Sequence, residues 1–134
     1  MRKKGNVCDY VAQRDHELAV CFRRHLREAF ILDLDEIFRK VSRSPASRFF
    51  ISESRAYELV RRYEATGNWN VRSRTRLAMM AEIYSRVERM RRADPTLPLQ
   101  DAVYEVVGSP APAFYLTPRS CRTILYAYAA GRAD

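Results

Sequence analysis

Two stretches of nine residues decide how this chain folds. They read SPASRFFIS at residues 44–52 and SPAPAFYLT at residues 109–117, so one constant shift takes Ser44 to Ser109. The same shift pairs identical residues elsewhere, among them Glu17 with Glu82, Arg24 with Arg89, Val41 with Val106 and Tyr63 with Tyr128. We interpret the pattern as an internal duplication.

Each stretch predicts a turn between two helices. A proline cannot continue a helix and disfavours helical angles in the residue before it, so the apolar segments before Pro45 and Pro110 must end there. Ser52 and Thr117 stand where the N-cap of a new helix is expected, and Pro118 takes the first helical position, where proline is tolerated. The repeated unit is therefore helix, extended aromatic elbow, helix.

The spacing of apolar residues predicts an all-α fold. They recur at three- and four-residue steps, and no segment alternates for long enough to form a sheet. Helices are expected over residues 9–30, 33–41, 52–66, 73–93, 99–107 and 118–130. Asp33 and Glu36 form a predicted capping box, and Gly67 and Gly131 are expected to end the helices that precede them.

The duplication predicts two tandem, pseudo-symmetric three-helix units that share a core. The first covers residues 1–66, a short linker covers residues 67–72, and the second covers residues 73–134. Apolar residues of the helices, including Phe30 and Leu34, are expected to face the core. The elbow aromatics Phe49, Phe50, Phe114 and Tyr115, and Trp69 of the linker, are expected to pack inside rather than to stack on bases.

Composition points to an anionic partner. The chain has 134 residues, a net charge of +8 and 24 basic residues, of which 21 are arginine. A balance of this kind favours nucleic acid, although it is also common in proteins that are merely soluble. No apolar run has the length of a signal peptide core or a membrane span. Three cysteines without a pairing pattern agree with a reducing compartment, so a cytoplasmic location is expected.

The short helix that leads through an elbow into a capped helix resembles the helix-turn-helix family of DNA-binding domains. The resemblance implies that the third helix of a unit lies in the major groove. The elbow departs from the family, whose turn has about 3–4 residues. Residues 44–52 also resemble a Ser-Pro-x-x-Arg-Phe-aromatic-aliphatic-Ser pattern of small bacterial proteins of unknown function, which adds no activity.

Seven arginines are the candidate nucleic-acid contacts. They are Arg48 in the first elbow, Arg55, Arg61 and Arg62 on the following helix, and Arg72, Arg74 and Arg76 at the linker and the next helix start. Arginine can meet phosphates or guanine edges. The alternative is a solvated helix face neutralised by nearby glutamates. Arginine at a helix start is electrostatically unfavourable, and this mismatch favours a functional role for the last three.

The third helix of the second copy has a different outward face. Where the first copy has Arg61 and Arg62, the second has Tyr126 and Ala127. Tyrosine is enriched and charge is depleted in interface cores, so Tyr126 is a candidate contact in a homodimer formed through the second copy.

No constellation of residues predicts catalysis. Four glycines are too few for most nucleotide-binding motifs, and Cys21 with His25 supplies two ligands where zinc needs three or four. We expect no catalytic, metal or cofactor site. The leading hypothesis is a non-enzymatic DNA-binding or nucleic-acid-associated protein that could act in regulation, and the alternative is a helical protein-interaction module. A continuous positive face favours the first, and arginines paired to carboxylates favour the second.

Overall fold

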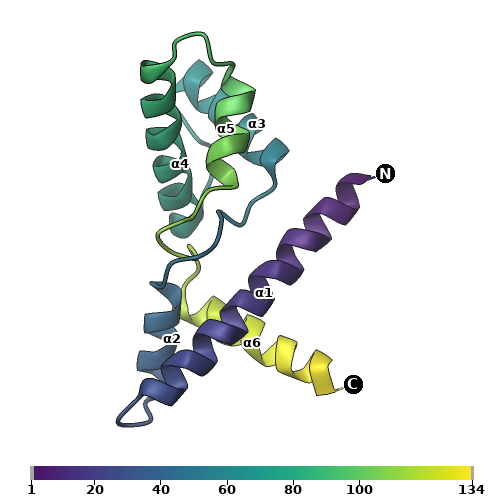
Figure 1. Ribbon diagram of the computed structural model, residues 1–134, viewed down its shortest axis with the longest axis vertical. Helices are drawn as coiled ribbons and strands as arrows, with labels where there is room; N and C mark the ends of the chain where they lie inside the picture. Colours follow the sequence, from purple (N-terminus) through teal and green to yellow (C-terminus); the bar gives the residue numbers. More distant parts are fainter. Residues whose placement is uncertain (1, 134) are drawn as a thin grey trace. The chain divides into compact units, whose positions relative to one another are not determined.

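Six helices make up the described part of the chain. The computed structural model describes residues 2–133, with side chains over residues 10–131. The helices are α1 (Arg2–Glu28), α2 (Leu34–Ser42), α3 (Glu53–Thr66), α4 (Arg74–Ala93), α5 (Leu99–Val107) and α6 (Pro118–Ala133) (Figure 1). The prediction of an all-α fold is confirmed.

The predicted boundaries are wrong at α1 and at the end of α6. Helix α1 begins at Arg2 rather than at residue 9, and it ends at Glu28, which leaves Phe30 in a loop. Helix α6 runs through Gly131 to Ala133. The two glycines differ in backbone conformation: Gly67 has a φ of 74° and ends α3 in the left-handed conformation, whereas Gly131 has no positive φ and continues the helix.

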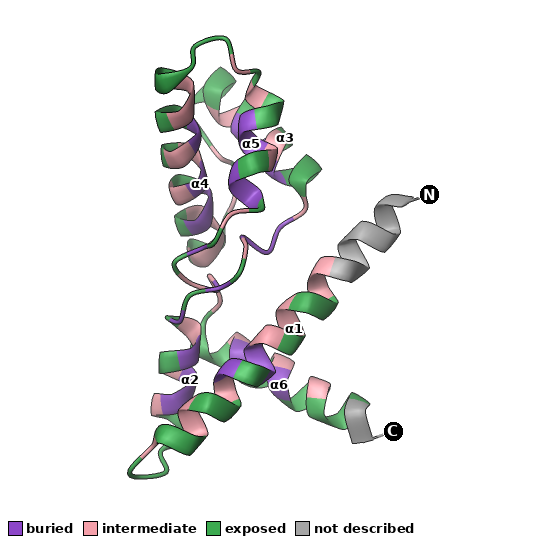
Figure 2. Cartoon of the chain, in the orientation of Figure 1, coloured by how far each residue is buried: buried purple, intermediate pink, exposed green. Residues whose placement is uncertain are grey.

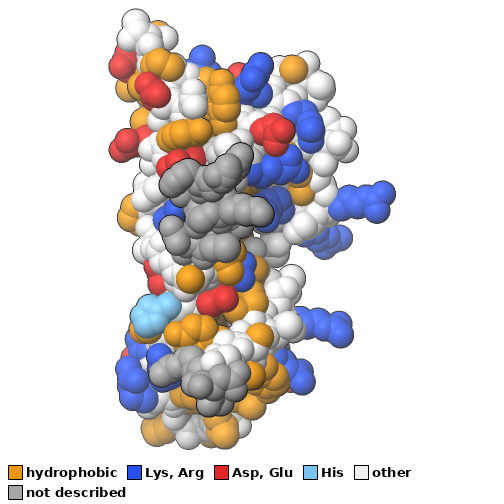
Figure 3. All heavy atoms as spheres, turned by 90° about the vertical axis from the view of Figure 1, so that its right-hand side faces the viewer, with side chains coloured by type: hydrophobic (Ala, Val, Ile, Leu, Met, Phe, Trp, Pro, Cys, Tyr) orange, Lys and Arg blue, Asp and Glu red, His pale blue; other side chains and the backbone are white. Residues whose placement is uncertain are grey.

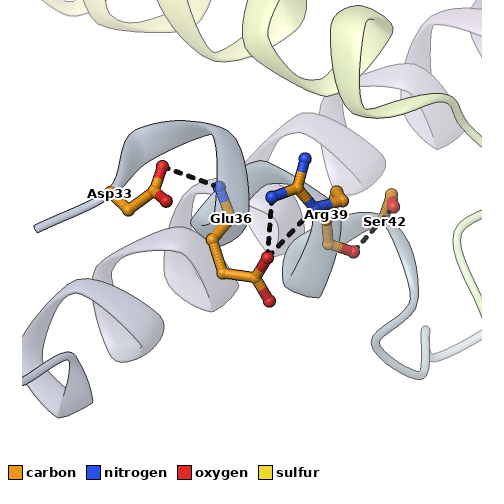
Figure 4. A network of polar contacts seen from close by, with 4 residues as sticks. All are labelled: Asp33, Glu36, Arg39 and Ser42. Atoms are coloured by element: carbon orange, nitrogen blue, oxygen red, sulfur yellow. Dashed lines mark hydrogen bonds and ion pairs between the residues drawn. The ribbon is translucent and has the colours of Figure 1, made fainter. Parts of the chain in front are cut away.

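The start of α2 follows half of the predicted capping box (Figure 4). The Glu36 amide donates to Asp33 Oδ1 at 3.3 Å, as an N-cap requires. The Glu36 carboxylate does not reach back to the cap. It accepts from Arg39 Nε at 3.0 Å and from an Arg39 terminal nitrogen at 2.8 Å, and Ser42 Oγ donates to the Arg39 carbonyl. Side-chain contacts therefore tie the first turn of α2 to its last.

The helices group into two compact units. Residues 1–46 and 112–134, here the terminal unit, contain α1, α2 and α6, which pack on one another. Residues 47–111, here the inserted unit, contain α3, α4 and α5, with α3 and α4 both on α5. The expected tandem division at residues 67–72 differs from this grouping. The extended elbows carry the chain away from α2 and α5, so each following helix packs on helices of the other copy.

The helix bounds recur under the shift that relates the two sequence copies. Helices α2 and α5 begin and end at matching positions, α3 and α6 begin at matching positions, and α1 and α4 end at matching positions. One backbone difference separates the elbows, because Tyr115 has a φ of 59° and Phe50, its counterpart, has no positive φ. Superposition of the two copies stays a prediction.

Each unit has its own apolar core, seen as buried helix faces in Figure 2. Phe49 in the inserted unit and Phe114 in the terminal unit are both buried, as predicted, and Phe50 is buried as well. Phe30 and Leu34 are exposed, contrary to prediction. Phe30 is exposed because α1 stops at Glu28, so the 3.6-residue period no longer places it on the buried face, and Leu34 is the first residue of α2.

Candidate nucleic-acid interface

All seven candidate arginines lie in the inserted unit, which covers residues 47–111. The N-cap Ser52 accepts from the Arg55 amide at 3.1 Å and starts α3. Ala56, Leu59 and Val60 bury the opposite face of the helix. The 3.6-residue period then directs Arg55, Arg61 and Arg62 away from that core.

The arginines of α3 have different local partners. Arg55 forms an ion pair with Glu58 at 2.9 Å, so its charge is neutralised within the helix. The Arg61 guanidinium lies 5.6 Å from the centre of the Tyr57 ring, a cation–π contact that leaves its donors available. Arg62 is half-buried. Among the described residues, no carboxylate pairs with Arg61 or Arg62.

Arg48 is engaged by its own elbow. Its Nε donates to the Phe49 carbonyl at 2.9 Å, and a terminal nitrogen donates to the Ile51 carbonyl at 2.7 Å. The guanidinium also lies 5.9 Å from the centre of the Phe50 ring. Arg48 therefore ties the elbow together, a role that its position in the sequence did not indicate.

Arg72, Arg74 and Arg76 surround the start of α4. Ser73 caps the helix by accepting from the Arg76 amide at 3.1 Å, and the first turn contains no acidic residue. None of the three arginines has an ion pair among the described residues. The helix dipole adds partial positive charge at this end, so the start of α4 is a region of positive potential that an anion would stabilise.

An aromatic cluster holds this arginine strip next to the end of α3. Trp69 stacks on Tyr63 with ring centres 4.3 Å apart, and Tyr84 of α4 meets both rings edge-on. Tyr84 also donates to Glu64 at 3.3 Å. Burial, together with the carboxylates of Glu88 and Glu64, raises the pKa of Tyr84 to about 12, so the hydroxyl keeps its proton. Trp69 thus packs between two helices of one unit.

The charges of the inserted unit are partly paired and partly free. Arg55, Arg86, Arg91 and Arg92 form ion pairs with Glu58, Glu82, Glu64 and Glu88. Figure 3 shows Lys and Arg side chains gathered along one side of the upper part of the view, with most of the visible acidic side chains on the other. The inserted unit therefore has neither a continuous positive face nor a surface on which every arginine is paired to a carboxylate.

Arg86 is a half-buried side chain with several contacts inside the inserted unit, and the sequence did not single it out. It pairs with Glu82 at 2.8 Å, donates to the Pro110 carbonyl at 2.7 Å and lies 5.1 Å from the centre of the Phe49 ring. A hollow of about 340 Å³ opens beside it, lined by Arg86, Arg89, Met90, Glu105, Val106 and Ser109. The matching position in the first copy is Cys21, so comparison of the two copies did not indicate these contacts of Arg86.

Tyr126 lies at the edge of a groove in the terminal unit, with 55% of its surface exposed. The groove has a volume of about 290 Å³ and is lined by Ala19, Phe22, Arg23, Leu125, Tyr126, Tyr128 and Ala129. Phe22 stacks on Phe38, which meets Tyr126 edge-on, and the Arg122 guanidinium lies 5.5 Å from the Tyr126 ring centre. An apolar hollow therefore lies between α1 and α6.

The Cys21 and His25 pair does not assemble a metal site. Cys21 is buried, and His25 Nε2 lies 3.0 Å from Ser44 Oγ. Burial lowers the pKa of His25, with Arg24 and Lys40 adding to the effect and Glu28 opposing it. Burial also raises the pKa of the Cys121 thiol to about 12. Across the described side chains, no three His, Cys, Asp or Glu residues cluster as metal ligands would.

Comparison with protein-family models, curated proteins and solved structures gives no match. No helix in the described range combines the length and the apolar character needed to cross a bilayer. Among the described helices, α2 packs on α1 and α6, and α3 packs on α4 and α5. The case for a nucleic-acid interface therefore depends on the arginines of the inserted unit and their local contacts.

Proposed function

We propose that the protein binds nucleic acid, most simply duplex DNA, through the inserted unit. One observation carries the proposal. Arg61, Arg62, Arg72, Arg74 and Arg76 have no carboxylate partner among the described residues, and neither has Arg89, whereas Arg55, Arg86, Arg91 and Arg92 are paired. Unpaired arginines concentrated on two joined helices supply the bidentate donors that phosphate groups accept.

The binding mode that these residues support is contact with the phosphate backbone. Arg61 and Arg62 extend from α3, and the start of α4 adds three arginines and the positive end of the helix dipole. Phosphate contacts fix the position of a protein on a duplex without reading its sequence. In this proposal the protein is nucleic-acid-associated and acts in the cytoplasm. Binding of this kind requires no enzymatic step, metal or cofactor.

A titration of duplex DNA at two salt concentrations tests the proposal. Each neutralised phosphate contributes about 0.9 to the slope of log K against log salt, so five arginine contacts predict a slope near −4.5. Glu53→Gln, which removes one negative charge from the first turn of α3, is a control for net charge and should leave the slope unchanged. Absence of binding at low salt would refute the proposal.

A second candidate function is protein interaction through the terminal unit. It is favoured by the location of the exposed large apolar side chains found among the described residues, all of which belong to that unit: Val20, Phe30, Ile31, Leu32, Leu34 and Tyr126. Contiguous exposed apolar surface marks interaction sites in soluble proteins. Tyr126 would then contribute to a homodimer or to contact with another protein.

A further inference from the structure

The terminal unit exposes an apolar loop tip that its own fold does not use. Residues 29–33 join α1 to α2, and within this loop Phe30 is fully exposed, Ile31 is 81% exposed and Leu32 is 69% exposed. Figure 2 shows most of the loop as exposed. Three consecutive large apolar side chains in water are unfavourable for an isolated molecule, so the tip is a candidate contact surface.

The loop is anchored at both ends. The Ala29 amide donates to the Leu26 carbonyl at 3.3 Å where α1 ends, and Asp33 caps α2 at the other end. The Glu36 and Arg39 ion pair fixes the first turn of α2 behind the cap (Figure 4). Anchored ends restrict a short loop, which reduces the conformational entropy lost when its tip is bound.

Three charged residues beside the loop are acidic, and Arg27 in the last turn of α1 is basic. Glu28 precedes it, Asp33 ends it and Asp35 follows in the first turn of α2, and none of the three forms an ion pair among the described residues. An anionic lipid surface would repel this end of the unit. A partner that matches the loop needs an apolar hollow with cationic edges.

The groove between α1 and α6 has those properties. Phe22, Leu125 and Ala129 give it apolar walls, and Arg23 lines it. Arg122 lies over the ring of Tyr126 at its edge, and α6 contains no acidic residue. Neither Arg23 nor Arg122 has a carboxylate partner among the described residues. The groove therefore complements the loop in both polarity and charge.

Loop and groove lie on the same unit, which identifies the occupant. Within one molecule the loop tip is fully exposed, so it does not fill the groove of its own chain. The groove is centred near residue 21 of α1, and α1 ends at Glu28, roughly 10 Å further along at about 1.5 Å per residue, with the loop tip beyond that end. Two copies with antiparallel α1 helices can place each loop over the other groove.

We propose that residues 29–33 of one copy dock in the α1–α6 groove of a second copy, reciprocally, to form a twofold homodimer through the terminal unit. A twofold interface is self-complementary, as this pairing requires. Two loops of three large apolar side chains, with the groove surfaces that they cover, bury on the order of 1,000 Å², the lower limit for a biological interface, so a weak dimer is expected. The proposal rests on the second candidate function and is independent of nucleic-acid binding.

Sedimentation equilibrium of the full chain over a range of concentrations tests the dimer. The wild type should approach twice the monomer mass, and Phe30→Ser with Ile31→Ser should restore the monomer mass while circular dichroism keeps its helical signal. Val20→Ser removes an apolar side chain of the same unit, 47% exposed and outside the groove, and should leave the dimer intact. A wild type that stays monomeric, or a dimer that survives the loop variant, overturns the proposal.

A charge exchange tests the pairing of loop with groove. Asp35→Arg alone and Arg23→Glu alone should each weaken the dimer at least about tenfold, a change of about 1.4 kcal/mol. The double variant restores opposite charges at the two positions, with their signs exchanged between loop and groove, and should recover most of the lost affinity. Single variants without effect, or a double variant that is weaker than either, contradict the proposed docking of the loop in the groove.

Two further measurements separate the rival explanations. Binding of a monomeric wild type to phosphatidylcholine vesicles that is lost in Phe30→Ser with Ile31→Ser would assign the loop to a lipid surface and overturn the dimer. DNA titration of the same variant should keep the wild-type salt slope, because the arginines of the inserted unit are untouched. If the wild type forms the dimer but does not bind DNA, the nucleic-acid proposal alone is refuted.

Discussion

The inserted and terminal units differ much more on their surfaces than in their helices. Both have a long helix, a nine-residue helix and a third helix that follows an elbow. Both units contain arginines without carboxylate partners among the described residues, among them Arg61, Arg62, Arg72, Arg74, Arg76 and Arg89 in the inserted unit, whereas the exposed large apolar side chains found there all belong to the terminal unit. The comparison shows that the pattern which builds the core leaves the outward positions free to change, so partners must be inferred from those positions.

The largest expected effect tests whether the two cores are equivalent. Phe49→Ala in the inserted unit and Phe114→Ala in the terminal unit should each lower the free energy of unfolding by about 3–5 kcal/mol, because each removes a buried ring. Urea unfolding with Phe49→Leu and Phe114→Leu as controls measures the difference. A loss below about 1 kcal/mol for one of them would show that the two elbows contribute unequally to stability.

The aromatic cluster of the inserted unit should come next. Trp69→Ala removes its contacts with Tyr63 and Tyr84, each worth about 0.5–1.5 kcal/mol, so we expect a loss of about 2 kcal/mol in unfolding free energy. DNA affinity should fall with it if the cluster positions the arginine strip. Trp69→Phe should recover much of the lost stability and of the lost DNA affinity.

Tyr126→Ala in the terminal unit should leave DNA affinity unchanged and weaken association of the protein with itself.

The arginines of α3 give the direct test of a division of labour. Arg61→Ala with Arg62→Ala should reduce the salt slope of DNA binding by about 1.8 and weaken binding about tenfold. Lys40→Ala with Arg43→Ala removes the same charge from exposed positions of the terminal unit and should have little effect. Equal effects of the two pairs would indicate binding by net charge and remove the distinction between the units.

Two glycines provide a smaller, opposed pair of effects. Gly67→Ala should destabilise the protein by about 1 kcal/mol, since its φ of 74° strains any residue with a Cβ atom although the space around it is open. Gly131→Ala should stabilise it by about 0.5–1 kcal/mol, because the position is helical and also open. Thermal unfolding of both variants measures the contrast, and effects of the same sign would contradict the assigned backbone conformations.

The smallest effect is a pH dependence confined to the terminal unit. The pKa of His25 is lowered from 6.5 in the folded protein, so the unfolded chain binds a proton first as the pH falls. Its contribution to stability is therefore complete above pH 6.5 and is lost as the pH falls from there toward the lowered value. His25→Gln should flatten the unfolding free energy in this window, and an unchanged profile would rule out His25 as the source.

The sequence predicted the helices well because their signals are local. Pro45, Ser52 and Gly67 act through backbone angles and single hydrogen bonds, and Asp33 caps α2 as expected. The exposure of Phe30 was missed because apolar periodicity does not show where a helix ends. Phe30, Ile31 and Leu32 lie between that end and the Asp33 cap, which is the signal for a loop.

The site was predicted less well, because partners depend on tertiary packing. Nothing in the sequence distinguishes Arg48, which binds elbow carbonyls, or Arg55, which pairs with Glu58, from Arg61 and Arg62. The grouping of α6 with α1 and α2 was missed for a related reason. An elbow shows that one helix ends and another begins, but not on which helices the second will pack.

That grouping sets the order in which the protein can assemble during synthesis. All three helices of the inserted unit lie within residues 47–111, so they can fold as soon as that segment has left the ribosome. Helices α1 and α2 are made before the inserted unit and wait for α6, which is made after it. Closing so long a stretch of chain slows folding. In the interval the nascent chain carries α1 and α2 without α6, so the apolar faces that α6 covers stay exposed to aggregation for longer than those of the inserted unit.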